Sequence, residues 1–399
     1  MRLIKSTVIA LTILFLASCA RTSGSVDDFS QSLYTPEEAS GFEILGAEGR
    51  ESILIRSRAP WQGATDETRE LLVLRDGESA PAGYDGPVVS DTISRIVCLS
   101  SGHMAMLSLL GECDAIVGGS GLDYITSPEI NSRRGELTEI GYEGAFDYEA
   151  LVAAKPDLVT IYGVNSANPI EAKLKELGIP YIYVGDYLED SPLGKAEWIV
   201  ALGECLGKRQ EAISQYRHIS DNYQAVKHRL DSISASERPK VMLNSPYGDS
   251  WFLPPVGSYM ARLVADAGGE YLGSGIRGNS SKAISMEEAA SMVANADRWI
   301  NIGSDVASIA DLRRRYPVVA NSGVVSRGAL FTNTLRSTPA GGNDFYESGI
   351  VNPDLILRDI IKILYPHLVS EAFNYYMPLP QSAPATVVDE ADSDGEQAE

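Results

Sequence analysis

The chain has 399 residues, and its hydrophobic fraction of 44% and charged fraction of 22% are ordinary for a soluble protein. This length is enough for two domains with separate cores. The formal net charge of −21 argues against nucleic acid and anionic lipid as partners, because binding to phosphates needs basic patches.

The N-terminus has the form of a signal peptide. Two basic residues precede an apolar run, Val8–Leu16, which is too short to span a membrane. The run ends in Leu16-Ala17-Ser18-Cys19, which is similar to the lipoprotein box of bacteria, where the cysteine carries the lipid. We expect residues 1–19 to be a lipoprotein signal peptide with Cys19 lipidated, and the polar residues 20–40 to be a tether. An ordinary signal peptide with an incidental cysteine is the alternative.

The remaining cysteines do not predict a disulfide framework. Export implies an oxidising compartment, yet only Cys98, Cys113 and Cys205 follow Cys19, and three is an odd number. Cys98 lies in an apolar run, so we expect a buried thiol there. The chain has no CxxC or His-x-x-x-His spacing, so we expect no resident metal and no cofactor.

Residues 41–94 are predicted to form an N-terminal β extension packed on the first lobe. Three short apolar runs, Phe42–Leu45, Ser52–Ile55 and Leu71–Leu74, are separated by glycine, proline and charged residues. The following Pro/Gly-rich stretch, Glu78–Asp91, is typical of a loop.

From Arg95 onward strands alternate with helices, which predicts parallel sheets covered on both faces. In a first lobe, residues 95–207, we expect strands at Ile96–Leu99, Ala115–Val117, Asp157–Ile161 and Tyr181–Val184, and helices at Met104–Leu110, Tyr148–Ala154, Ile170–Leu177 and Lys195–Leu206. In a second lobe, residues 236–380, we expect strands at Lys240–Leu243, Trp251–Leu253, Trp299–Ile302 and Leu330–Phe331, and helices at Tyr259–Ala267, Met286–Val293, Ile309–Tyr316 and Leu355–Leu364. Residues 381–399 are acidic and are expected to be a disordered tail.

One long helix is predicted between the lobes, over residues 208–235. Apolar residues at Tyr216, Ile219, Tyr223, Val226, Leu230 and Ile233 alternate in steps of three and four, which is one face of an α-helix. A long core helix or a short coiled coil is the alternative to a linker. Its place between two similar lobes favours a two-lobed binding protein.

A short pattern occurs once in each lobe. Asp147 and Ser285 can each cap a helix, and Glu149 and Glu287 follow two positions later, where the helix end is positive. Each helix then leads through an aspartate and an apolar strand to a glycine. The repeat indicates a pseudo-symmetric molecule, although capping by itself already accounts for each glutamate.

In their order and spacing these motifs resemble the iron-complex and cobalamin substrate-binding proteins of ABC importers. The resemblance runs from about Arg95 to Leu368 and is carried by Arg95–Ser101, Leu110-Gly111 with Ile116–Gly118, Tyr148–Leu151 with Lys155–Val159, Leu177–Pro180, Ala267–Gly269, Ser285–Glu287 and Ala296-Asp297. It implies an α/β fold of two Rossmann-like parallel-sheet lobes joined by one long α-helix. It also implies a monomeric binding protein rather than an enzyme, with an ABC permease as partner.

The resemblance assigns roles to particular residues. Glu149 and Glu287 occupy the positions that dock onto permease arginines in this family. Ligands of the family lie between the lobes, at loops that follow strands, as the general rule for open α/β sheets also states. Aromatic residues recur in these loops and suit a large planar or ring-bearing ligand, although packing within each loop explains each tyrosine equally well. The candidate ligand-binding residues are Ser101, His103, Tyr124, Tyr142, Tyr162, Tyr187, Tyr247, Trp251, Tyr259, Arg336, Asn343 and Tyr346.

Two other signals do not define sites. His103 has the chemistry to ligate haem iron or cobalt, but one histidine is no metal site, and we favour a hydrogen bond to a loop or a ligand. Gly273–Gly278 matches the letters of the dinucleotide-binding motif, yet no helix opens at it, so we expect a loop.

The sequence therefore predicts a lipoprotein of the cell envelope, periplasmic and held to a membrane only through Cys19. It would capture an iron complex (siderophore or haem) or cobalamin and deliver it to a permease, closing modestly about its ligand. Few candidate arginines, Arg277 and Arg336, disfavour a highly anionic ferric siderophore. The alternative is a surface lipoprotein of the same fold with a structural, adhesion or non-transport binding role. A metal-dependent enzyme is a third hypothesis.

Overall fold

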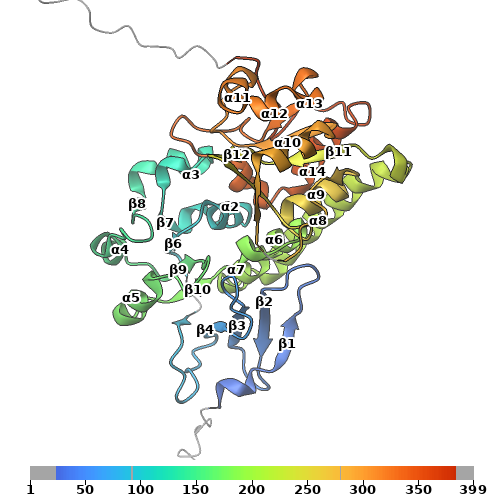
Figure 1. The fold of residues 1–399 in the computed structure, drawn as a ribbon. Coiled ribbons are helices and arrows are strands. Elements are labelled where there is room, and N and C mark those ends of the chain that lie inside the picture. The colour runs from blue at the N-terminus through green and yellow to red at the C-terminus, as the bar shows by residue number, and fades with distance from the viewer. Residues whose placement is uncertain (1–23, 91–92, 279, 383–399) are drawn as a thin grey trace, which may run out of the picture.

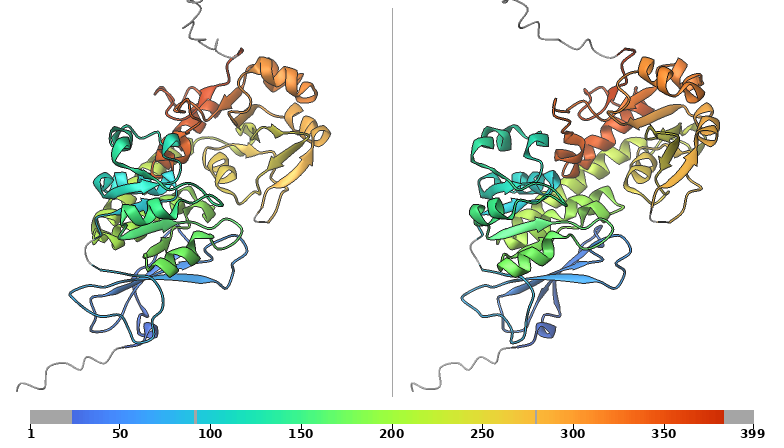
Figure 2. Two further views of the ribbon diagram at one scale, coloured as in Figure 1. Left: turned by 90° about the vertical axis from the view of Figure 1, so that its left-hand side faces the viewer. Right: turned by 60° about the vertical axis from the view of Figure 1, so that its left-hand side comes forward.

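The computed structural model describes residues 24–90, 93–278 and 280–382. They form an N-terminal β-sheet, an N-lobe and a C-lobe, with the sheet at the end of the molecule away from the C-lobe (Figures 1 and 2). The predicted signal peptide with Cys19 and nearly all of the predicted acidic tail lie outside the described residues.

The N-terminal sheet has the strand order β1-β2-β3-β4-β5, antiparallel from β1 to β4 and parallel between β4 and β5. Its strands are β1 (Gln31–Tyr34), β2 (Phe42–Gly46), β3 (Ile53–Arg58), β4 (Thr68–Val73) and β5 (Val88–Val89). One face, which includes Ile44, Ile55 and Val73, belongs to the main hydrophobic core of the molecule. The other face is covered by a smaller cluster around Phe29 and Leu54. The β extension is therefore packed on the N-lobe.

The tether predicted over residues 20–40 needs correction from residue 24 onward. A 3-10 turn at Val26–Asp28 precedes β1, and Phe29 is buried. Backbone N–H groups of residues 37–41 donate hydrogen bonds to two glutamates of the N-lobe. The polar composition concealed this order, because the bonds use backbone groups and acceptors that lie about 150 positions away along the chain.

The N-lobe contains a parallel sheet with the order β10-β9-β6-β7-β8. Its strands are β6 (Ile96–Cys98), β7 (Ile116–Gly119), β8 (Thr138–Glu139), β9 (Leu158–Ile161) and β10 (Tyr181–Tyr183), and its helices are α2 (Ser101–Leu109), α3 (Pro128–Ser132), α4 (Tyr148–Ala154), α5 (Ile170–Leu177), α6 (Pro192–Glu197) and α7 (Ile199–Cys205). The single helix predicted at Lys195–Leu206 is divided at Trp198, whose buried indole donates to Glu189.

The C-lobe repeats the plan with the order β14-β11-β16-β17-β18, in which only β18 is antiparallel to its neighbour. A small antiparallel sheet, β12-β13-β15, lies beside it. The strands are β11 (Lys240–Leu243), β12 (Pro246–Tyr247), β13 (Ser250–Leu253), β14 (Glu270–Tyr271), β15 (Lys282–Ser285), β16 (Arg298–Ile302), β17 (Leu330–Thr332) and β18 (Met377–Pro378). The helices are α9 (Tyr259–Asp266), α10 (Met286–Ala294), α11 (Ile309–Arg315), α12 (Pro317–Ala320), α13 (Gly323–Ser326) and α14 (Pro353–Leu364).

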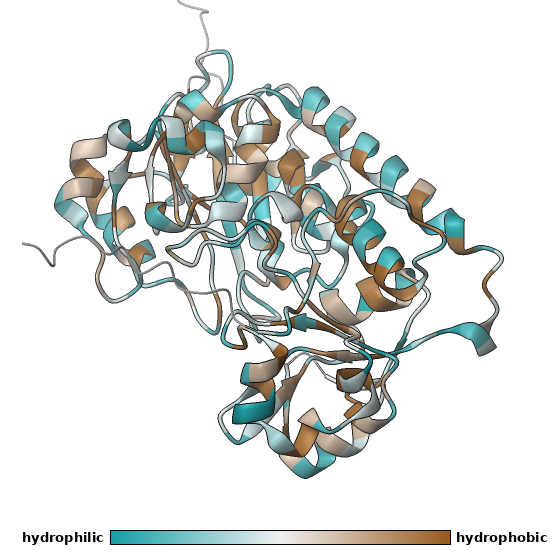
Figure 3. Ribbon diagram, turned by 90° about the horizontal axis from the view of Figure 1, so that it is seen from above, coloured by the Kyte–Doolittle hydropathy of each residue, from teal (hydrophilic) through white to brown (hydrophobic). Residues whose placement is uncertain are grey.

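One long helix, α8 (Arg209–Lys227), joins the lobes and packs against α7 of the N-lobe and α14 of the C-lobe. Its buried residues are Ala212, Tyr216, Ile219, Tyr223 and Val226. In Figure 3 hydrophilic and hydrophobic residues alternate along this helix, as expected for an element with one buried face.

The helix is shorter than the predicted range of residues 208–235. It ends at Lys227 and continues as a 3-10 turn, His228–Leu230. Leu230 and Ile233 still pack against the core. Apolar spacing extended the prediction too far, because a 3-10 turn can also place residues three apart on one side.

The described cysteines carry no disulfide: Cys98, Cys113 and Cys205 are buried free thiols. Burial raises the pKa of the Cys98 thiol to about 12, so it remains a neutral, small apolar group, as predicted. None of the helices in the described ranges is long and apolar enough to cross a membrane.

The contact between α8 and α9 makes a first prediction. Tyr223 donates to Asp266 Oδ2 at 2.9 Å, and Lys227 donates to Oδ1 at 2.6 Å. Tyr223→Phe should lower the free energy of unfolding by about 1–2 kcal/mol, because a bond to a charged acceptor is lost in a buried position. Urea denaturation measures this, with Tyr247→Phe at an exposed tyrosine as control. Equal stability of the two variants would contradict the role of this bond.

Candidate ligand-binding cleft

A cavity of about 640 Å³ lies between the two lobes. Its N-lobe wall follows the ends of β6, β9 and β10, which are neighbours in the parallel sheet. Such an edge is where ligands bind in open α/β sheets. The lining residues are Leu99, Ser100, Ser101, Tyr162, Val164, Asp186, Tyr187 and Lys195 from the N-lobe, and Tyr259, Phe345, Tyr346 and Ile350 from the C-lobe side.

Aromatic side chains from both lobes dominate the cavity. Tyr187 and Tyr346 are exposed by 53% and 57%, and Tyr162 and Tyr259 are partly buried. Phe345 is buried, with its ring edge-on to that of Tyr346 at 5.0 Å between centroids. Burial, with smaller contributions from Glu143 and Tyr187, raises the pKa of Tyr162, so its hydroxyl stays protonated at neutral pH. These walls offer flat apolar area and neutral hydroxyl groups.

Behind the N-lobe wall lies a buried polar pair. His103 Nδ1 is 2.9 Å from Thr160 Oγ1, and His103 Nε2 is 3.4 Å from Asp186 Oδ1. Burial would raise the pKa of Asp186, but the neighbouring His103 and the cationic Lys195 outweigh it, so the pKa lies below its ordinary value. Asp186 is therefore ionised at neutral pH.

Lys195 brings a positive charge to the cavity. It sits on α6 and donates through Nζ to the backbone oxygen of Asp186 at 2.7 Å. The ammonium lies over the rings of Tyr259 at 5.3 Å and Tyr187 at 5.9 Å, which is cation–π geometry. Burial lowers the pKa of Lys195, while Asp186, Glu189 and Asp190 oppose that shift. Among the lining residues Lys195 is the one lysine or arginine.

On the C-lobe side a chain of side-chain amides supports Tyr346. Asn301 donates to Asn244 at 2.8 Å, and Asn333 donates to Asn301 at 2.9 Å and to the Tyr346 hydroxyl at 3.3 Å. Asn244 and Asn301 have φ values of +66° and +60°, a conformation that asparagine tolerates better than most residues. The amide of Asn343 accepts from the backbone N–H of Phe345 at 3.1 Å and so shapes the aromatic turn.

Besides α8, a set of hydrogen bonds beside the cavity connects the two lobes. Glu347 accepts from the backbone N–H groups of Thr126 at 2.7 Å and Ser127 at 2.8 Å. The Thr126 hydroxyl donates to Asp344 at 2.9 Å. Burial raises the pKa of Glu347, an effect that these N–H donors oppose. The segment that carries Phe345 and Tyr346 is thus held against the N-lobe.

The structure brings together five of the twelve predicted ligand-binding residues at the cavity: Ser101, Tyr162, Tyr187, Tyr259 and Tyr346. Asn343 lies behind them. Tyr124 and Tyr142 form a separate pair, with ring centroids 6.5 Å apart and both side chains about half exposed. Arg336 forms an ion pair with Asp344 at 3.0 Å.

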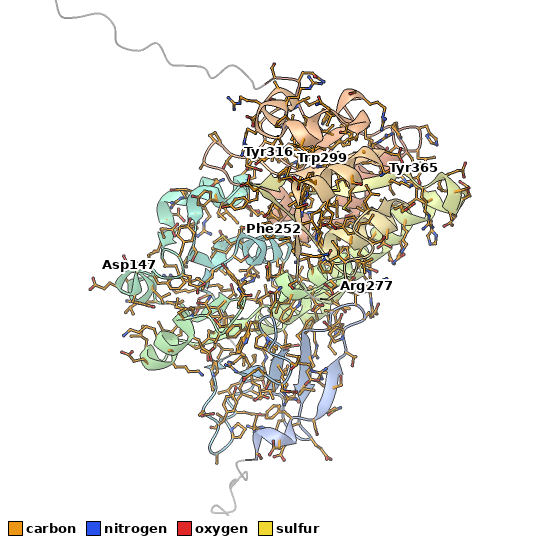
Figure 4. The ribbon with its side chains drawn as sticks, viewed as in Figure 1. Asp147, Phe252, Arg277, Trp299, Tyr316 and Tyr365 are labelled. Atoms are coloured by element: carbon orange, nitrogen blue, oxygen red, sulfur yellow. The ribbon has the colours of Figure 1, made fainter. Side chains whose placement is uncertain are left out.

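Three predicted residues need correction. His103 is fully buried, so it supports the wall and does not face the cavity. Trp251 is fully buried in the C-lobe, donates to the Leu243 oxygen and packs on Trp299, which Figure 4 labels within that lobe. Tyr247 is exposed by 76% on the β12–β13 hairpin and does not line the cavity. An aromatic residue near a strand end can line a cavity or pack in the hydrophobic core. The sequence pattern does not distinguish these two positions.

Sequence reasoning missed Asp186 and Lys195. Asp186 lies three residues beyond the end of β10, so its position near a strand end was a usable signal. Lys195 lies in the helix predicted at Lys195–Leu206, and only the packing of α6 against the 3-10 turn Asp186–Leu188 places it at the cavity.

The two predicted docking glutamates lie on different lobes. Glu149 is in the first turn of α4 and Glu287 in the first turn of α10, and both are exposed. The predicted caps are confirmed, since Asp147 accepts from the Ala150 N–H and Ser285 from the Glu288 N–H. Asp147 lies at the outer side of the N-lobe (Figure 4).

Residues 96–320, more than half of the chain, match a family model described as periplasmic binding protein, so the chain belongs to that family. Within the described residues, no group of three or more His, Cys, Asp or Glu side chains is arranged to hold a metal ion.

The chain is 24% identical over 295 residues to an uncharacterised lipoprotein of Methanocaldococcus jannaschii, covering 71% of this chain and 68% of that protein. Among solved structures, a periplasmic haem-binding protein from Pseudomonas aeruginosa aligns with a TM-score of 0.56 at 17% identity, over 73% of this chain and all of that one. A periplasmic haem-binding protein from Roseiflexus sp. RS-1 aligns with a TM-score of 0.55 at 20% identity, over 69% of this chain and 100% of that one. The chain thus shares the fold of these two haem-binding proteins, and its family is one of binding proteins.

The low pKa of Asp186 predicts a pH dependence of stability. A carboxyl group whose pKa is lower in the folded state than its unfolded value of about 3.9 stabilises the fold above that pH and loses this contribution below it. The free energy of unfolding of the wild type should therefore exceed that of Asp186→Asn at pH 6, and the difference should shrink as the pH falls from 5 to 3. Urea denaturation at several pH values measures it. A difference that does not depend on pH would contradict this assignment.

Proposed function

We propose that the protein is a lipid-anchored substrate-binding protein of an ABC importer. It captures an iron complex or cobalamin in the inter-lobe cavity and delivers it to a permease. The observation that carries this proposal is the convergence of four tyrosines, one phenylalanine and one lysine from both lobes on a single cavity at strand ends.

The cavity chemistry favours a flat, conjugated ligand with few negative charges, and haem is the first candidate. Its volume of about 640 Å³ is in the range of cofactor-sized sites. One cation, Lys195, suits a ligand carboxylate, whereas a highly anionic siderophore would need more positive charge. The residues that line the cavity include no histidine, cysteine or methionine. A bound ferric centre would therefore meet tyrosine oxygens, which are hard donors suited to ferric iron.

The proposed anchor is a lipid on Cys19 in the cell envelope. In Figure 1 the chain enters the described structure through the N-terminal sheet, at the end of the molecule away from the C-lobe. A membrane anchor preceding this sheet would leave both lobes clear of the lipid. The alternative, a surface lipoprotein with a structural or non-transport role, is supported by the sheet itself, which adds a body to the two-lobed family fold.

The ligand proposal predicts saturable binding of haemin by the purified chain. We expect a shift in the haemin absorbance spectrum and a rise in the melting temperature, because a ligand of the folded state stabilises it by mass action. Lys195→Met should weaken binding about 10-fold or more, since a charge-assisted hydrogen bond contributes about 1.5–3 kcal/mol.

Lys208→Met is the matched control, because Lys208 immediately precedes α8 and pairs with Glu112 of the N-lobe, outside the cavity. Cobalamin and ferric siderophores are titrated in parallel. Saturation by one of these instead would replace haem as the ligand. No response to any of the three would reject the proposed ligand class.

Docking through the two lobes predicts a separate phenotype. Glu149→Ala combined with Glu287→Ala should abolish uptake and leave ligand affinity unchanged, because both carboxylates are exposed and outside the cavity. Glu143→Ala with Glu288→Ala removes two exposed neighbours and serves as the control. Uptake assays with the intact transporter and titration of the purified variants measure the two properties. Lost affinity with intact uptake would overturn the docking roles.

A further inference from the structure

The segment that leads from β1 to β2 is bound by a buried carboxylate of the N-lobe. Glu197 on α6 is fully buried. Its Oε1 accepts from the Tyr34 hydroxyl at 2.6 Å and from the Glu37 N–H at 2.7 Å. Its Oε2 accepts from the N–H groups of Glu38 at 2.8 Å and Ala39 at 2.7 Å. Four donors from one short segment therefore surround this carboxylate.

A second buried carboxylate, Glu189, binds the next residues of the same segment. It accepts from the N–H groups of Ser40 at 3.0 Å and Gly41 at 2.9 Å, and from the Ser40 hydroxyl at 3.1 Å. The Trp198 indole donates to it at 3.0 Å. A side chain at Gly41 would approach the Trp198 ring to 2.8 Å, so glycine permits this close contact.

Neither carboxylate forms an ion pair with a lysine or arginine among the described residues, and their hydrogen bonds come from N–H and O–H groups. A buried carboxylate is costly unless its charge is compensated. Most of the donors that compensate Glu189 and Glu197 belong to residues 34–41. The conformation of both glutamates thus depends on this segment being in place.

The same stretch of the N-lobe forms part of the ligand cavity. Asp186 and Tyr187, in the 3-10 turn Asp186–Leu188, and Lys195, on α6, line the cavity. Glu189 follows that turn directly, and Glu197 is two residues beyond Lys195. One side of this stretch faces the cavity and the other side binds the N-terminal segment. Glu38 adds a further link by accepting from the Ser191 hydroxyl at 2.8 Å.

We propose that residues 34–41 are a positioning element of the ligand cavity, acting through Glu189 and Glu197. The segment holds the stretch from Asp186 to Glu197 from behind and so fixes the orientation of Tyr187 and Lys195. Ligand binding and docking of this segment then stabilise each other, since coupling between two sites is reciprocal. The expected effect on ligand affinity rests on the proposed function. The expected effect on the order of residues 186–197 does not.

Hydrogen exchange of the ligand-free full chain, followed by mass spectrometry, tests the inference. Glu197→Gln places an amide N–H₂ among backbone donors and should speed exchange about tenfold or more in residues 37–41 and also in residues 186–191. Glu204→Gln is the matched control, because Glu204 is also buried but pairs with Arg75 and Arg209 and contacts neither region. Faster exchange in residues 37–41 alone would overturn the proposal.

Tyr34→Phe covers the case in which Glu197→Gln does not fold. It removes a single donor and leaves the carboxylate, so exchange should rise in both regions to a smaller extent. A rise confined to residues 37–41 would again reject the coupling. If the wild type binds haemin, Glu197→Gln should weaken binding about tenfold and Glu204→Gln should not. If it binds no haemin, haem is rejected as the ligand, and the exchange data still decide the inference.

Discussion

The structure depends on the packing of α8 into a core that both lobes share. Tyr216, Ile219 and Tyr223 are buried in a cluster that also contains residues of α7 and α14, so the helix is not an exposed rod between two separate bodies. Burial of such side chains supplies most of the favourable free energy of folding. Because one hydrophobic core includes α8 and residues of both lobes, the two lobes have a defined relative position. The cavity between them is therefore lined by residues of both lobes.

Buried carboxylates hold the irregular segments that surround this core. Glu189 and Glu197 bind residues 34–41, and Glu347 binds the N-lobe turn at Thr126. Asp359 likewise accepts from the backbone N–H groups of Asn374, Tyr375 and Tyr376. Each acid meets backbone donors rather than a basic side chain. A strongly acidic chain can thus use part of its negative charge to fix loops without an equal number of lysines and arginines.

The composition of the cavity follows from the arrangement of the strands and of the irregular segments. Parallel strands bring the residues after β6, β9 and β10 to one edge, and the Asp344–Ile350 segment carries its aromatic side chains to the opposite side. The result is a site with large aromatic area, one cation and one adjacent carboxylate. Under the proposed function, such a site would recognise its ligand by shape and stacking more than by charge.

The sequence by itself determined the class of the protein. Alternating strands and helices, the steps of three and four in the long helix, and the ordered motifs from Arg95 onward specify two α/β lobes joined by a helix, because local periodicity reports which face of each element is buried. It also located tyrosines such as Tyr162 and Tyr259 near strand ends. It did not separate Tyr259, which lines the cavity, from Trp251, which is in the core, because both are aromatic residues near strand ends.

Only the tertiary structure decided which side chains meet. The approach of residues 37–41 to Glu189 and Glu197 joins positions about 150 apart in the chain through backbone groups, which leave no trace in the residue pattern. Lys195 lies at the cavity because α6 packs against the 3-10 turn Asp186–Leu188, and His103 is buried behind the cavity wall, in contact with Thr160 and Asp186. Long-range packing and the compensation of buried charge set these outcomes, and neither is encoded in the periodicity of a single segment.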